Sequence, residues 1–235
     1  MHLKYLAWDS VFFDKKIGEV NCKTDSKTEL FLLLEQAKSE KYQLVYVYSN
    51  DDYAVCTNLL SEYGARLVDI KVVFKKTLLP NQKSENCAQE YLSNDLTIEL
   101  ESLAYFSGYF SRFRVDLKFG KDAYFNLYKT WLTKSLSNEI ADKVYVIKEL
   151  DKIIAFITLK MSDEVGKIGL LSVSELHQGK GYGKKLIDSC INTLLKNGIY
   201  EIEVTTQMAN LSGCRFYEKC GFSTSKLTSV YHFWL

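Results

Sequence analysis

Three glycines stand at alternate positions in residues 178–184, and lysines lie between and after them. Glycine has no side chain, so the backbone at Gly179, Gly181 and Gly183 can approach a bound anion closely. A helix-like pattern follows at once, which would aim free backbone N–H groups and the positive end of a helix dipole at the same point. With the charges of Lys180, Lys184 and Lys185, this loop predicts a site for a phosphate or a pyrophosphate.

Two common phosphate-binding patterns fail at specific residues of this loop. A dinucleotide-binding GxGxxG pattern that starts at Gly179 requires glycine at position 184, where the chain has Lys184. A P-loop that ends at Gly183 requires glycine at position 178 and Ser or Thr at 185, where the chain has Gln178 and Lys185. The loop therefore belongs to neither class.

The elements around the loop alternate between strands and helices. Residues 167–174 predict a strand that leads into the loop, and the apolar residues from Leu186 to Leu195 predict an amphipathic helix after it. The sequence then predicts a strand, a short helix and a final apolar strand, at residues 200–207, 210–222 and 225–235. A strand before the loop and a helix after it are the elements that a backbone phosphate site needs.

The rest of the chain predicts two further groups of elements. Residues 143–150 and 153–161 are typical of an antiparallel hairpin, and two helices are expected before it, at 95–107 and 119–138.

The N-terminal part predicts strand, helix, strand, helix and strand, with the second helix at residues 51–64. The only proline, Pro80, opens a polar stretch that we interpret as a linker at 80–94. We therefore expect a smaller N-terminal α/β region at 1–79 and a second domain at 95–235.

The composition is that of a globular protein with ordinary charge. Charged residues make up 25% of the 235 residues and the net charge is +1, so nothing predicts a nucleic-acid partner. No window reaches the roughly 18 apolar residues of a membrane span, and the N-terminus lacks the apolar run of a signal peptide. The six cysteines form no paired zinc spacing, so we expect no metal site, and free thiols in a cytoplasmic protein.

The residues around the loop resemble those of a known superfamily. The pattern Gln-x-x-Gly-x-Gly, met by Gln178, Gly181 and Gly183, is similar to the acetyl-CoA loop of the GNAT superfamily of N-acetyltransferases. The later segment NLSGCRFYEKCGF supplies the Asn, Tyr and Gly-Phe that often follow in this superfamily, although Gly213 stands where alanine is common. The resemblance covers residues 95–235. It implies acetyl-CoA as the cofactor and the GNAT fold, α/β (α+β) with a central mixed, mostly antiparallel sheet flanked by helices.

The resemblance also implies a role for each part of the site. It places the pantetheine arm of the cofactor along the strand before the loop, and the pyrophosphate on the loop itself. The implied cofactor-binding residues are Leu171, Ser172, Val173, Gln178, Gly179, Lys180, Gly181, Tyr182, Gly183, Lys184 and Asn210. For Asn210 the alternative is a plain helix N-cap. Tyr217 is the expected general acid, which would protonate the departing CoA thiolate, and its alternative is a tyrosine of the core.

The base that deprotonates the acceptor amine has no single candidate in the sequence. His177 borders the loop, His232 lies in the last predicted strand, and Glu175 is acidic. Each has a structural or solvated alternative, and water could suffice for a weakly basic sugar amine. The sequence shows no nucleophilic Cys or Ser constellation, so we expect direct transfer in a ternary complex.

A narrower resemblance concerns the acceptor. The segments LAWDSVFFDKKIG and SGYFSRFRVD resemble the dTDP-fucosamine acetyltransferases, which have an extra N-terminal α/β region. These enzymes acetylate the amine of a nucleotide-linked 4-amino-4,6-dideoxyhexose, which implies a nucleotide-sugar substrate and a place in polysaccharide biosynthesis. Arg112 and Arg114 would bind the diphosphate or a sugar carboxylate, and His232 is a further substrate-binding candidate. Four N-terminal residues could wall the acceptor pocket or pack this region against the core: Trp8, Asp9, Phe12 and Phe13.

Two alternatives keep the cofactor and change the function. The acceptor could be an amino acid, a polyamine, an antibiotic or a protein N-terminus, or the protein could be a CoA-binding sensor without catalysis. The apolar C-terminal strand VYHFWL permits a homodimer without requiring one.

Overall fold

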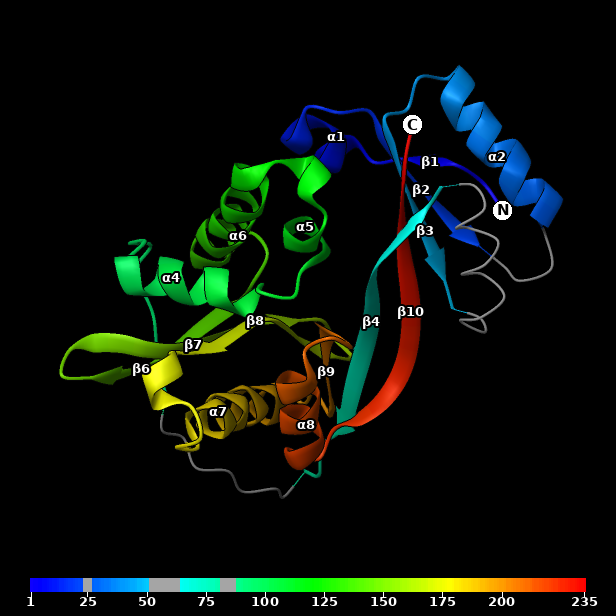
Figure 1. Cartoon of the computed structure of the whole chain (residues 1–235). Coiled ribbons are helices and arrows are strands. Elements are labelled where there is room, and N and C mark those ends of the chain that lie inside the picture. The colour runs from blue at the N-terminus through cyan, green and yellow to red at the C-terminus, as the bar shows by residue number, and fades with distance from the viewer. Residues whose placement is uncertain (23–26, 51–63, 81–87) are drawn as a thin grey trace.

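The computed structural model shows one mixed sheet that runs through the whole molecule (Figure 1). It describes four ranges of the chain: residues 1–22, 27–50, 64–80 and 88–235. The strands in these ranges are β1 (Lys4–Tyr5), β2 (Ile17–Cys22), β3 (Leu44–Ser49), β4 (Arg66–Thr77), β5 (Gln89–Glu90), β6 (Lys143–Glu149), β7 (Lys152–Met161), β8 (Gly166–Val173), β9 (Glu201–Gln207) and β10 (Ser223–Trp234). Their order is β1-β2-β3-β10-β4-β9-β8-β7-β6-β5. Pairing is parallel at β2–β3 and β8–β9 and antiparallel at the other junctions.

Helices cover both faces of this sheet. They are α1 (Ala7–Phe13), α2 (Lys27–Ser39), α4 (Ile98–Ser107), α5 (Arg112–Val115), α6 (Lys121–Leu136), α7 (Tyr182–Lys196) and α8 (Leu211–Lys219). Figure 1 shows α4, α5 and α6 on one face of β6–β9, and α7 and α8 on the opposite face. The expected helix at 51–64 falls almost entirely outside the described residues.

The helix after the glycine loop forms as predicted, because its apolar side chains repeat at helical spacing. In α7 the side chains of Leu186, Ile187, Cys190, Ile191 and Leu194 are at most 1% exposed. They belong to one core cluster with side chains of β4, β6, β7, β8 and β9. Burying each large aliphatic side chain contributes about 1.5–3 kcal/mol, so this stripe fixes the helix to the sheet.

Three details differ from the expectations. The helix expected at 95–107 begins at Ile98, because the Thr97 hydroxyl caps it by accepting the Leu100 N–H at 3.3 Å. The expected linker contains β5, which pairs with β6. The N-terminal helix α1 was not expected at all, and Phe13 of α1 stacks on Phe113 of α5 with ring centroids 5.3 Å apart.

The chain contains a topological repeat that the sequence does not reveal. β2, α2 and β3 form a strand–helix–strand unit with parallel strands, and β8, α7 and β9 form another. β4 follows the first unit along the chain but pairs with β9 of the second, and β10 pairs with β3 of the first. The two exchanged strands pair with each other at the centre of the sheet.

This exchange joins the two predicted domains in one sheet. β10, from the predicted transferase domain, lies between β3 and β4 of the predicted N-terminal region. The division at residues 80–94 stays a prediction. The basis of the dimer expectation is wrong, because Val230, Tyr231 and Phe233 of the C-terminal strand are buried inside the sheet. A homodimer therefore stays a prediction without support from that strand.

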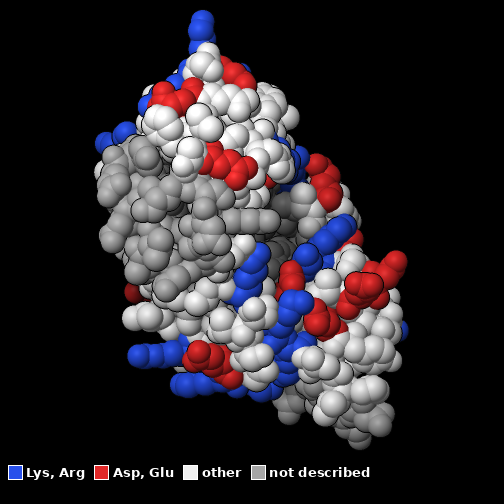
Figure 2. Space-filling view, turned by 90° about the vertical axis from the view of Figure 1, so that its right-hand side faces the viewer, with Lys and Arg blue, Asp and Glu red and all other residues white. Residues whose placement is uncertain are grey.

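The described surface is of mixed charge. On the face shown in Figure 2, basic and acidic side chains lie interspersed. Salt bridges join such side chains on neighbouring strands, for example Lys75 to Glu201 at 2.6 Å and Lys167 to Glu203 at 3.2 Å. In the described ranges, no helix is both long and apolar enough to cross a lipid bilayer.

Within the described ranges, Cys190, Cys214 and Cys220 have free thiols, and Cys22 is buried. Cys56 and Cys87 lie outside the described residues.

Candidate active site

The parallel strands β8 and β9 separate along their length. They pair at three positions near the start of β8, from Gly166 opposite Ile202 to Ile168 opposite Val204. Beyond Ile168, β8 leads to the glycine loop, while β9 stays paired with β4 up to Gln207. The backbone along this gap is therefore open to an extended ligand, which could pair with it as an added strand would.

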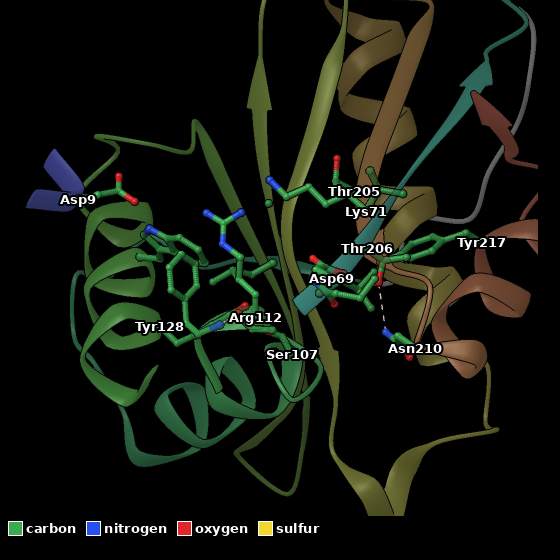
Figure 3. Close-up of a pocket in the computed structure, with 18 of the residues that line it drawn as sticks. Asp9, Asp69, Lys71, Ser107, Arg112, Tyr128, Thr205, Thr206, Asn210 and Tyr217 are labelled. Carbon is green, nitrogen blue, oxygen red and sulfur yellow. Dashed lines mark hydrogen bonds between the residues drawn. The ribbon is translucent and has the colours of Figure 1, made fainter. Parts of the chain in front are cut away.

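A cavity of about 430 Å³ lies at this gap (Figure 3). Asn210 and Tyr217 line it from α8 and the segment before it, whereas Arg112 and Tyr128 line it from α5 and α6. These helices lie on opposite faces of the sheet. A ligand that enters from one face can therefore meet a ligand that enters from the other.

A β-bulge in β8 shapes the edge of the cavity. Ile157 pairs with Leu171 and Leu159 with Ile168, so two residues of β8 face Thr158 of β7. Thr158 Oγ1 accepts the N–H of Leu170 at 2.8 Å, and a Cβ on Gly169 would lie 2.8 Å from the same oxygen. The bulge thus requires glycine at position 169, and it bends β8 away from β9.

The glycine loop has the backbone that an anion site requires. Gly179 has a φ of +75° and Gly181 a φ of +85°, a left-handed region that side chains disfavour. A Cβ at either position would meet nothing within 4 Å, so the space before the loop is open. Gly181 caps the 15-residue helix α7, whose first N–H groups lie beyond the reach of intrahelical acceptors.

Gly183 has a different reason to be glycine. A Cβ there would lie 2.9 Å from the ring of Phe216 in α8, so the missing side chain lets α7 and α8 pack closely. The sequence pattern grouped Gly183 with Gly181, but only Gly179 and Gly181 have positive φ values in this loop. Gly183 therefore affects the loop indirectly, because it sets how closely α7, the helix that follows the loop, packs against α8.

Polar side chains hold the loop to its surroundings. Lys184 Nζ pairs with Asp188 Oδ2 at 2.5 Å, and Tyr182 donates to Glu149 at 3.4 Å. The loop lysine Lys180 is exposed, and Lys185 is half-buried with its Nζ 5.6 Å from the ring centroid of Tyr182. They add positive charge beside the helix N-terminus, which favours an anion there.

The strand residues expected at the cofactor arm lie at the gap. Leu171 lines the cavity, and its side chain packs with that of Val173 against the core cluster under α7. Ser172 is buried. The Gln178 side chain donates to the Val173 carbonyl at 3.3 Å, so one expected loop residue fastens the loop to the end of β8.

The position of Asn210 is compatible with both roles expected from the sequence, cofactor binding and helix N-capping. Its Oδ1 accepts the Gly213 N–H at 3.0 Å, which makes it the N-cap of α8. Its Nδ2 donates to Thr206 Oγ1 at 3.2 Å, and the residue also lines the cavity. A Cβ on Gly213 would lie 2.4 Å from Asn210 Nδ2, so glycine replaces the common alanine to make room for this cap.

Tyr217 extends from α8 into the cavity (Figure 3). Its ring is held by Phe74 and Phe222, with centroids 5.7 and 5.9 Å away, and the residue is 7% exposed. Burial raises the pKa of its phenol above the ordinary value, so the hydroxyl stays protonated at neutral pH. The described residues offer this hydroxyl no hydrogen-bond partner, so it is available to a ligand.

Arg112 lines the opposite part of the cavity and is 8% exposed. Its guanidinium lies 4.5 Å from the ring centroid of Tyr46 and 4.6 Å from that of Phe113, and Nη1 donates to the Tyr48 hydroxyl at 3.2 Å. Its Nε has no hydrogen-bond partner among the described residues. A buried guanidinium normally pairs with a carboxylate, so this one is suited to an anionic ligand.

Three charged cavity residues were not identified as a group from the sequence: Asp9, Asp69 and Lys71. Burial raises the pKa of the Asp69 carboxyl to about 6 and also raises that of Asp9. Burial, and then the charge of Arg112, lower the pKa of Lys71 to about 8. The sequence did not single out Asp69 and Lys71, because charged residues at alternate positions of a strand normally lie on its solvent-exposed face.

Two expected substrate residues lie elsewhere. Arg114 is exposed, and its guanidinium rests 3.8 Å from the ring centroid of Tyr109. His232 is fully buried, and its Nδ1 lies 2.6 Å from Asp116 Oδ2. Burial lowers the pKa of His232 to about 4, which keeps the ring neutral at pH 7. Neither residue lines the cavity.

The base candidates beside the loop are also outside the cavity lining. His177 uses both ring nitrogens within the protein, 2.6 Å from Ser174 Oγ and 2.8 Å from Glu149 Oε2. Glu175 is exposed in the turn before the loop.

Residues 109–222 match the model of the Acetyltransferase (GNAT) family. The matched range begins just before α5 and ends just after α8, so it includes the gap between β8 and β9, the glycine loop and Tyr217. Residues 109–222 form a GNAT acetyltransferase domain. The protein is an acetyl-CoA-dependent N-acetyltransferase, and acetyl-CoA is its cofactor.

Solved structures share the GNAT fold over most of the chain. A GCN5-related N-acetyltransferase from Sphaerobacter thermophilus is 13% identical with a TM-score of 0.59, covering 93% of this chain and 73% of that one. A conserved protein of unknown function from Staphylococcus epidermidis is 12% identical with a TM-score of 0.62, covering 93% and 83%. A tandem GNAT protein from the clavulanic acid biosynthesis pathway is 9% identical with a TM-score of 0.52, covering 93% and 75%. These similarities show the fold, and the predicted fold class is confirmed.

The residues of the GNAT domain fit acetyl-CoA. The open loop before α7 suits the pyrophosphate, and the backbone along the β8–β9 gap suits the amide-rich pantetheine arm. The acetyl group would then lie near Tyr217, whose hydroxyl is unused by the described residues.

Proposed function

We propose that the enzyme acetylates the primary amine of a small anionic acceptor, a nucleotide-linked amino sugar of the dTDP-4-amino-4,6-dideoxyhexose type. The observation that carries this proposal is Arg112, a buried guanidinium in the cavity that forms no salt bridge within the described ranges. A diphosphate would supply the anionic partner that this guanidinium lacks. Lys71 in the same cavity adds a second cation.

The mouth of the cavity suits a ring-bearing acceptor. Trp8 lines the cavity, is 42% exposed, and stacks on Phe12 with ring centroids 4.9 Å apart. An exposed aromatic face offers contact area to a sugar or a nucleobase. Phe12 itself packs against the core cluster, as the packing interpretation of the N-terminal phenylalanines requires.

In the proposed reaction, acetyl-CoA and the acceptor are bound together and the amine attacks the thioester directly. None of the described cysteines lines the cavity, so no thiol there could carry the acetyl group. Tyr217 would donate its proton to the thiolate as the tetrahedral intermediate collapses. Its high pKa makes it a positioned hydrogen-bond donor rather than a strong acid.

A second candidate acceptor is an amino acid, because its carboxylate could also pair with Arg112. The two cations of the cavity disfavour polyamines, which would bring further positive charge to a buried site.

A CoA-release assay with acetyl-CoA and a panel of amines tests the proposal. The panel contains dTDP-4-amino-4,6-dideoxyhexoses, the same sugars without the nucleotide, amino acids, spermidine and peptides. We expect turnover of the dTDP-linked sugars, and a KM at least about tenfold higher for the free sugars, because they lack the anion that pairs with Arg112. Activity on spermidine or peptides, with none on dTDP-linked sugars, contradicts the proposal.

A further inference from the structure

Four charged side chains line the acceptor end of the cavity without pairing with one another. Asp9, Asp69, Lys71 and Arg112 form no salt bridge of 4.0 Å or less with any described residue. Arg112 is buried and the other three are half-buried. Charges withdrawn from water without an ion-pair partner are costly unless a ligand compensates them. The two cations suit the anionic part of the acceptor, which leaves the two carboxylates for its ammonium group.

The two carboxylates differ in their distance from the expected reaction centre. In Figure 3, Asp9 lies on α1 at the far side of Arg112, whereas Asp69 lies between Arg112 and Tyr217. Asp69 belongs to β4, two residues before Lys71, which pairs with Gln207 at the end of β9. Asp69 therefore lies where β9 ends at the gap, on the side from which the acceptor would enter.

We propose that Asp69 is the general base, which takes a proton from the ammonium group of the bound acceptor. This inference rests on the proposed function, because it requires an amine in the cavity between Arg112 and Tyr217. It assigns the role that the sequence left open among His177, Glu175, His232 and water, since none of those three side chains lines the cavity.

The surroundings of Asp69 suit a base that works near neutral pH. The charged and titratable groups that act on it or are influenced by it are Lys71 of β4, Arg112 of α5 and Tyr128 of α6. Asp9 of α1 and Tyr217 of α8 line the same cavity. Arg112 and Lys71 favour the carboxylate, but burial has the larger effect and raises its pKa to about 6. Asp69 is thus ionised at pH 7 and is a stronger base than an exposed aspartate.

The proposed step conserves protons and electrons. The acceptor enters as R–NH3+, its N–H bond breaks with the proton going to Asp69, and the freed lone pair forms the C–N bond to the acetyl carbon. The C–S bond then breaks, its electron pair leaves on sulfur, and the sulfur takes the proton of Tyr217. The second proton lost by nitrogen returns Tyr217 to its neutral form, and Asp69 releases its proton to solvent. The products are the acetamide, CoA thiol and one proton.

The test compares the pH dependence of kcat/KM for the full-length wild type and Asp69→Asn, with a dTDP-4-amino-4,6-dideoxyhexose as acceptor. For the wild type we expect kcat/KM to rise with pH through about 6, as Asp69 ionises. For Asp69→Asn we expect a loss on the order of 100-fold at pH 7. The loss should shrink above the pKa of the amine, because solution then supplies the neutral nucleophile.

The matched control is Asp163→Asn, a change in the exposed turn between β7 and β8 that should keep the wild-type profile. A loss that is equal at every pH would show a merely structural role for Asp69, and wild-type kcat/KM at pH 7 would show no role. Either result overturns the inference.

If the wild type leaves the dTDP-linked sugars untouched, the proposed acceptor is wrong, and Asp69 is then tested on acetyl-CoA hydrolysis. There water replaces the amine and gives its proton to the same carboxylate. A slower hydrolysis by Asp69→Asn would support the inference, and an unchanged rate would overturn it.

Discussion

At the scale of single residues, burial gives the site its chemistry. Arg112 and Asp69 are ordinary charged residues in the sequence, and each acquires its proposed role only because the fold removes it from water. Tyr217 likewise becomes a donor without a protein partner because Phe74 and Phe222 hold its ring at the cavity. Unpaired polar groups of this kind are energetically unfavourable in a folded protein, and a ligand can compensate them.

Tyr217→Phe tests the general acid. We expect kcat to fall on the order of 100-fold, because the thiolate loses its proton donor. The Kd for acetyl-CoA, measured by calorimetry, should stay within a few-fold of the wild type, since the ring and its packing remain. A variant with full turnover would show that Tyr217 is only a core residue.

Arg112→Gln tests the proposed anion-binding role of Arg112. We expect KM for the dTDP-linked acceptor to rise on the order of 30-fold, equivalent to about 2 kcal/mol, with acetyl-CoA affinity unchanged. The control is Arg66→Gln, which changes an exposed arginine of β4 outside the cavity lining. Equal effects of the two changes would mean that only the overall charge matters.

At the scale of elements, two glycines of one short pattern serve different purposes. Gly181 turns the chain in the left-handed region before α7, whereas Gly183 lets α7 pack against Phe216 of α8. The pattern Gln-x-x-Gly-x-Gly therefore combines a backbone suited to an anion with a helix–helix contact. The sequence indicated the loop correctly, but it could not separate the two reasons.

Replacing each glycine with alanine distinguishes these purposes. For Gly181→Ala we expect Kd for acetyl-CoA to rise at least about tenfold, because the Cβ points into the open space before the loop. For Gly183→Ala we expect a loss of about 1–3 kcal/mol in unfolding free energy from contact with Phe216, with a smaller change in Kd. Calorimetry and thermal melts measure both quantities. The reverse pattern would contradict these assignments.

At the scale of the whole molecule, the two strand–helix–strand units differ where a cofactor would bind. β2 and β3 stay paired at six positions along their length, while β8 and β9 pair at three and then separate. The sequence between β2 and α2, residues 23–26, contains no glycine. The first unit thus lacks both the gap and the glycine loop. The strand that follows it along the chain, β4, carries Asp69 and Lys71.

This difference predicts one cofactor for each chain. Titration of the full-length protein with acetyl-CoA should give a stoichiometry of one, because among the described residues only the β8–β9 unit offers an open strand edge and a loop suited to an anion. Gly181→Ala should weaken that single event without revealing another. A stoichiometry of two would show that the first unit also binds the cofactor.

The sequence by itself determined the local features of the part of the site that is expected to bind acetyl-CoA. The glycine loop, the amphipathic helix α7, the hairpin of β6 and β7, and the GNAT fold class could all be predicted, because each depends on residues close together in the chain. Tyr217 and Asn210 were named in advance, and the structure brings both to the cavity. Their roles stay predictions until the variants are measured.

Only the tertiary structure decided which residues line the part of the cavity proposed for the acceptor. Asp9 comes from α1, Asp69 and Lys71 from β4, and Arg112 from α5. The exchange of β4 and β10 brings the N-terminal strands beside the transferase domain. It also placed Arg114 on the surface and His232 in the core, although both were candidates from their residue types. Burial and charge pairing depend on contacts distant in sequence, and local patterns carry no information about them.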